Sequence, residues 1–176
     1  MSTYIDNFKR FWPLLVELVA RDIKIKYRKS IMGVLWTLLN PLLMMIVLSI
    51  VFSNIFKFDM ENFPLYLLSG QVIFNFYSDS TNTSMSAIIM NAPLIKKVYV
   101  PKYLFVLSRV ISSTINLLAS FTALLLVMTA MRAELHFMSF LFFVPLALLI
   151  VFSLGISLML SAIVVKFRDV RRAGSR

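Results

Sequence analysis

The 176-residue sequence contains no cysteine, a single histidine and only four glycines. Without cysteine it has neither disulfides nor thiolate metal ligands, and its redox compartment cannot be inferred. The short motifs of catalysis are absent as well, since no HExxH, GxSxG or Walker-type phosphate loop occurs. We therefore expect a chain that is not an enzyme, binds no metal or cofactor of its own, and does not hydrolyse ATP by itself.

Charged residues are also scarce, at 15% of the chain, whereas 60% of the residues are hydrophobic. Soluble domains contain about 25% charged and about 45–50% apolar residues. A small domain cannot bury this much apolar surface, because much of its volume lies close to solvent. The composition excludes an ordinary soluble enzyme and a disordered basic tail. It predicts an all-α membrane protein, built as a polytopic helical bundle.

Long apolar stretches divide the chain. A bilayer core of about 30 Å requires roughly 20 apolar residues in a helix. Four stretches meet this requirement and are predicted to be membrane spans: 31–56, 65–90, 104–131 and 138–165. Together they leave little sequence for a folded domain outside the membrane.

The net charge of +10 is distributed unevenly between the connections. Of the 18 lysines and arginines, only Lys57 and Arg132 lie in the first and third connections. The other sixteen lie before the first stretch, in or just after the middle connection, or after the fourth. The positive-inside rule then predicts that both termini and the 91–103 loop are cytoplasmic. This sidedness accounts for the charge without a nucleic-acid partner.

Residues 1–30 precede the first stretch and mix aromatic, aliphatic and charged side chains. Such a pattern is typical of an amphipathic helix lying at the cytoplasmic membrane surface. A simple topogenic anchor is the alternative. Five cations between Arg21 and Lys29 can bind anionic lipid head groups or meet a charged partner.

The second stretch carries polar residues at helical spacing, which places them on one face. They are Gln71, Asn75, Ser78, Asp79, Asn82 and Ser86. Such a face must meet other helices or a water-filled path rather than lipid. Asp79 is the only acidic residue clearly inside a predicted span. It either lines a pathway or serves packing as a hydrogen-bond partner between helices, for example with Arg109.

A substrate pathway is one reading of this face and its surroundings. Asn40-Pro41 predicts a kink in the first span, and aromatic residues near the polar face offer a stacking surface for sugar rings. The alternative reading is helix packing and interfacial anchoring. The predicted pathway residues are Trp36, Asn40, Gln71, Phe74, Asn75, Tyr77, Asp79 and Asn82.

The 91–103 loop contains a short apolar and basic segment between two prolines, enough for about two helical turns. We expect Leu94, Val98 and Pro101 to point away from the membrane body, which favours a docking surface for a cytoplasmic partner. The predicted docking residues are Pro93, Leu94, Ile95, Lys96, Lys97, Val98, Tyr99 and Pro101.

These segments together resemble a known family. The matching stretches are Leu18–Arg28, Ser30–Trp36 followed by Asn40-Pro41, Leu94–Pro101, and Phe167–Val170. In this order and topology, the sequence resembles the permease subunit of ABC-2 type polysaccharide exporters, which include O-antigen, capsular polysaccharide and teichoic acid exporters. The resemblance covers nearly the whole chain as a single transmembrane domain, residues 1–176.

The resemblance implies an interface helix at 1–30 and a coupling helix in the 91–103 loop. The coupling helix would dock into a separate ATPase subunit, which binds ATP and Mg. The substrate would be a lipid-linked polysaccharide, moved through a homodimer of permeases in the bacterial cytoplasmic (inner) membrane among membrane lipids. Compared with the family pattern the last two spans are absent, which indicates a truncated or frame-shifted reading frame, or a fragment.

Two other function classes stay open from the sequence. The first is a non-transporting membrane scaffold or assembly factor, whose middle loop binds some other protein. The second is an ion channel or secondary carrier that uses Asp79.

Overall fold

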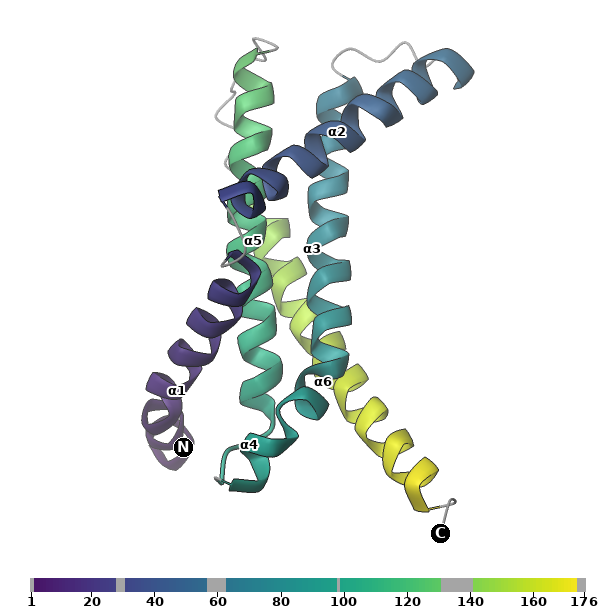
Figure 1. Cartoon of the computed structure of the whole chain (residues 1–176). Coiled ribbons are helices and arrows are strands. Elements are labelled where there is room, and N and C mark those ends of the chain that lie inside the picture. Colours follow the sequence, from purple (N-terminus) through teal and green to yellow (C-terminus); the bar gives the residue numbers. More distant parts are fainter. Residues whose placement is uncertain (1, 28–30, 57–62, 98, 131–140, 174–176) are drawn as a thin grey trace.

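The computed structural model describes residues 2–27, 31–56, 63–97, 99–130 and 141–173. Its elements are α1 (Ser2–Tyr27), α2 (Ile31–Phe56), α3 (Phe63–Met90), α4 (Ala92–Lys97), α5 (Tyr103–Ala130) and α6 (Phe143–Ala173) (Figure 1). No strand occurs in these ranges, and the prediction of an all-α protein is confirmed.

The helices follow the apolar stretches closely. α2 has the predicted bounds, and α3 and α5 differ from them by at most two residues. α6 instead continues past the apolar run to Ala173, because lysine and arginine are good helix formers even where they end a membrane segment.

Two helices in the described ranges are long and apolar enough to cross a membrane, within Tyr103–Thr129 and Phe143–Phe167. Both present many apolar side chains outward, as lipid contact requires. α3 differs because hydroxyl, amide and carboxylate side chains interrupt its apolar run from Ser78 to Ser86. The four-span topology as a whole stays a prediction.

α3 and α5 run antiparallel at the centre of the molecule (Figure 1). α6 packs against α3, α2 crosses both central helices, and α1 lies along one half of α5. The N-terminal end of α1, the short helix α4 and the C-terminal end of α6 all lie at the same end of the molecule (Figure 1).

Within the described ranges, two apolar clusters hold the helices together. The lower cluster joins α1 to α5 around Leu15, Leu18, Leu104 and Phe105, near the α4 end. The upper cluster joins α3 to α5 and is formed by Leu68, Val72, Phe76, Leu117 and Leu124. Between them, α3 carries its polar residues.

A line of buried serines joins α3 to α6: Ser80, Ser84, Ser153, Ser157 and Ser161. Ser80 and Ser153 share a hydrogen bond between their hydroxyls. The Ser157 hydroxyl also donates to the Ser80 carbonyl oxygen at 3.4 Å. Small side chains let two helix backbones approach closely in a membrane, and hydroxyls add hydrogen bonds between them.

Replacing Ser157 with leucine is expected to destabilise the α3–α6 contact by about 2 kcal/mol, because overpacking a filled contact forces the helices apart. Gly155→Leu in the same helix is the matched control, since a Cβ there meets nothing within 4 Å. The midpoint of thermal unfolding in detergent measures both. Equal midpoints for the two variants would contradict the close packing.

Candidate functional site

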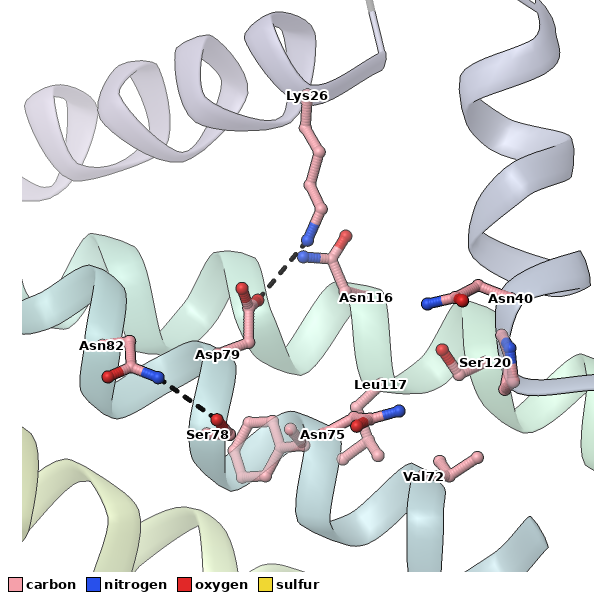
Figure 2. Close-up of a pocket in the computed structure, with 12 residues that line it drawn as sticks. Lys26, Asn40, Val72, Asn75, Ser78, Asp79, Asn82, Asn116, Leu117 and Ser120 are labelled. Atoms are coloured by element: carbon pink, nitrogen blue, oxygen red, sulfur yellow. Dashed lines mark hydrogen bonds and ion pairs between the residues drawn. The ribbon is translucent and has the colours of Figure 1, made fainter. Parts of the chain in front are cut away.

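A cavity of about 480 Å³ opens between α1, α2, α3 and α5 (Figure 2). Its polar lining residues are Lys26, Asn40, Asn75, Ser78, Asp79, Asn82, Asn116 and Ser120, and its other lining residues are Pro41, Val72, Phe76 and Leu117. Val72, Phe76 and Leu117 also belong to the upper apolar cluster. We call Val72, Phe76 and Leu117 the apolar floor of the cavity, and most of the other lining residues are polar.

Asp79 lies at the point where three helices meet in this cavity. Its Oδ2 atom lies 3.4 Å from Lys26 Nζ of α1 and accepts a hydrogen bond of 2.9 Å from the Ser113 hydroxyl of α5. Both charged side chains of the pair are partly exposed, at 42% for Lys26 and 37% for Asp79. The ion pair thus faces the cavity rather than a sealed core (Figure 2).

The predicted pairing of Asp79 with Arg109 is wrong. Arg109 points to α1 instead, where its Nη1 atom lies 3.2 Å from Asp22 Oδ2. Asp79 is held by Lys26 and Ser113. Arg109 lies about one turn before Ser113 on α5, which places it beside the buried carboxylate of α1 rather than beside α3.

Four predicted pathway residues line the cavity: Asn40, Asn75, Asp79 and Asn82. Three others do not. Phe74 is 66% exposed on another side of α3, Tyr77 stacks on Phe152 of α6 with ring centroids 6.3 Å apart, and Gln71 is half-buried one turn away. Trp36 belongs to α2, but its side chain lies outside the described residues.

Lys26, Asn116 and Ser120 also line the cavity but are not among the predicted pathway residues. A signal for the α5 pair was present, because Ser113, Asn116 and Ser120 follow the spacing of one helical face. The apolar residues between these positions make the polar pattern less evident in the sequence. Lys26 lies 53 residues from Asp79 in the chain, and local periodicity carries no information about such a contact.

The cavity lining suits a hydroxyl-rich ligand. Its amides and hydroxyls both donate and accept hydrogen bonds, and Asn82 Nδ2 already donates to Ser78 Oγ at 3.2 Å. Lys26 and Asp79 balance each other in charge, so the lining carries no net charge. The apolar floor can contact the CH faces of a sugar ring, while the amides contact its hydroxyls.

α4 forms the second feature of interest and corrects one expectation. Leu94 and Ile95 do not point away from the body, because both pack against the lower apolar cluster between α1 and α5. Pro101 is half-buried, and Val98 lies outside the described residues. The outward surface of this segment is formed instead by Pro93, Lys96, Lys97 and Tyr99, with Tyr99 93% exposed.

The chain is similar in sequence to known membrane permeases. The chain is 29% identical to an O-antigen export system permease protein of Klebsiella pneumoniae, over 94% of this chain and 64% of the relative. It is 32% identical to an O-antigen export system permease protein of Myxococcus xanthus, over 97% of this chain and 66% of the relative. A polysialic acid transport protein of Escherichia coli is 27% identical over 88% of this chain and 61% of the relative.

The chain thus spans 61–66% of the length of these three relatives. The family model for ABC-2 type transporters matches residues 13–175, which is almost the whole chain. The apolar helices and these relatives together make this an integral membrane protein. The chain therefore belongs to the ABC-2 type transporter family, whose members are membrane transport subunits.

Proposed function

We propose that this chain is the permease subunit of an ATP-driven exporter that moves a lipid-linked polysaccharide across the bacterial cytoplasmic membrane. It works as a homodimer with a separate ATPase, which binds ATP and Mg. The chain crosses the membrane four times with both termini and α4 on the cytoplasmic side, and α1 begins at that surface.

The observation that carries this proposal is the polar cavity between α1, α2, α3 and α5. Polar groups are costly inside a membrane and face other helices or water rather than lipid, so a cluster of them around a cavity supports a path for a polar ligand. The cavity lining combines amides with an apolar floor, and this chemistry matches a sugar better than an ion. The named relatives export O-antigen or transport polysialic acid, which supports the same ligand class.

The ATPase partner is supported by the surface around α4. Lys96, Lys97 and Lys102 are all exposed there, beside the exposed ring of Tyr99. A basic surface with one protruding aromatic side chain suits an acidic groove on a partner. We propose that this groove belongs to the ATPase subunit.

The test is transport of lipid-linked glycan into inside-out membrane vesicles that contain the chain and its ATPase. Asn75→Leu and Asn82→Leu should each lower the ATP-dependent rate about tenfold, because each removes a hydrogen bond to the moving glycan. Phe74→Leu is the matched control on the same helix, since Phe74 faces away from the cavity. Unchanged transport in both asparagine variants would contradict the pathway.

A further inference from the structure

Asp22 of α1 is a buried carboxylate between two arginines. Its side chain is 3% exposed, and Oδ1 lies 3.1 Å from Arg21 Nη2, while Oδ2 lies 3.2 Å from Arg109 Nη1 of α5. Arg21 Nε also donates to Oδ1 at 3.3 Å. We call Arg21, Asp22, Asn91 and Arg109 the Asp22 cluster.

Arg21 also contacts Asn91, the residue that connects α3 to α4. Its Nη1 atom donates to Asn91 Oδ1 at 3.1 Å. Asn91 is buried and is the single residue between the two helices. Its side-chain Nδ2 donates to the Ala87 carbonyl of α3 at 2.8 Å, and its own carbonyl accepts from the Leu94 and Ile95 amides of α4, both at 3.0 Å.

Asn91 thus ends one helix and starts the next, and the Arg21 guanidinium holds it. A residue whose carbonyl accepts the first bonds of a helix sets the direction in which that helix leaves. The planar fork of arginine bonds two partners at once in fixed directions. Arg21 therefore fixes the orientation of α1 relative to the start of α4.

Apolar contacts already hold α1 in place without these charges. Leu15 and Leu18 are buried in the lower cluster, against which Leu94 and Ile95 of α4 also pack. Apolar contacts are non-directional, and buried ion pairs add little stability over well-packed apolar residues. The directional bonds of Arg21 add a fixed geometry that the apolar contacts do not supply.

We propose that Arg21 is a positioning residue that makes α1 follow the movement of α4. This inference rests on the proposed function, because the movement originates in an ATPase docked on α4. A rotation of α4 turns Asn91, the Arg21 fork carries the turn to α1, and the Asp22–Arg109 ion pair passes it to α5. Through Lys26 in its last turn, α1 also reaches Asp79 in the cavity.

The first test measures this link without the ATPase or a substrate. Because the chain has no cysteine, spin labels can be placed at Glu17→Cys on α1 and Lys97→Cys on α4, both exposed positions. The unaltered cluster should give one narrow distance distribution in lipid. Arg21→Ala should broaden it, and Lys24→Ala, which removes an exposed cation of the same helix, should not.

Arg21→Lys separates charge from geometry. A single ammonium group keeps the attraction to Asp22 but lacks the fork that bonds Asn91 at the same time. The distance distribution of the lysine variant should therefore be as broad as that of Arg21→Ala. Asn91→Ala should broaden the distribution in the same way. A narrow distribution in Arg21→Ala or Arg21→Lys would overturn the proposal.

The second test measures glycan transported per ATP hydrolysed. Arg21→Ala should keep the ATPase bound and active but transport about tenfold less glycan per ATP. Arg21→Ala with Asn91→Ala should be no worse than either variant alone, because the two residues act through one bond. Additive losses would overturn the proposal. Absence of ATP-driven transport in the unaltered chain would count against the proposed function, while the distance measurement would still decide the link.

Discussion

Asp22→Ala should destabilise the folded chain by about 3 kcal/mol, because removing one partner of a buried ion pair leaves the other charge without compensation. Arg109, whose side chain is 20% exposed, would lose its counter-ion and remain beside the positive charge of Arg21. We expect a lower midpoint of thermal unfolding and less monodisperse protein after extraction into detergent.

A paired substitution makes this prediction specific. Asp22→Leu combined with Arg109→Leu removes both charges of this pair, and apolar replacement of a whole pair is often neutral. The double variant should therefore recover most of the stability that Asp22→Ala loses. Glu17→Ala on the exposed side of α1 serves as the control. An Asp22→Ala midpoint equal to that of the control would show that the pair does not stabilise the fold.

Reversing the charge of Lys96 and Lys97 together should weaken binding of the ATPase at least about tenfold. Both side chains are exposed on α4, and like charges facing an acidic groove cost several kcal/mol while their attraction is lost. ATP-driven export should fall in parallel, whereas insertion into the membrane should not change. Co-purification of the two subunits from detergent measures the binding.

Two controls separate docking from folding. Lys166→Glu reverses an exposed charge on α6 and should leave binding unchanged. Leu94→Ala shortens a side chain that packs inward, so it should lower the unfolding midpoint without the large loss of binding. If Lys96→Glu with Lys97→Glu still binds the ATPase as the unaltered chain does, the docking surface lies elsewhere.

The helices of this chain could be predicted from the sequence because membrane segments are defined by length and apolarity, which are local properties. The bounds of α2 agree at both ends, 31 and 56. The end of α6 does not, because hydropathy reports where the apolar run stops and not where the backbone stops being helical. The +10 charge likewise indicated sidedness but none of the ion pairs.

The cavity could be predicted only where one helix carries the signal. The spacing on α3 placed Asn75, Asp79 and Asn82 together, and the structure puts all three in the lining. The lining residues from α1 and α5 could not be predicted in this way, because their closeness to α3 depends on the tertiary packing. Arg109 shows the same limit, since its nearest carboxylate in space is Asp22, 87 positions earlier in the chain.

The inward orientation of Leu94 could not be predicted from the sequence for a related reason. A short helix of six residues has no face that its own sequence can define. Its apolar side chains pack against the apolar side of α1. The sequence of the loop alone does not show that α1 lies beside it.

We propose that ATP hydrolysis by a docked subunit drives a glycan through this chain. The most direct measurement is uptake of lipid-linked polysaccharide into inside-out vesicles containing the chain and its ATPase, with ATP or with an ion gradient as the only energy source. We predict uptake with ATP and none with the gradient, and loss of uptake when the ATPase cannot hydrolyse ATP. Uptake that follows the ion gradient and requires Asp79, or no uptake although the two subunits co-purify, would show that this chain is not an ATP-driven glycan permease.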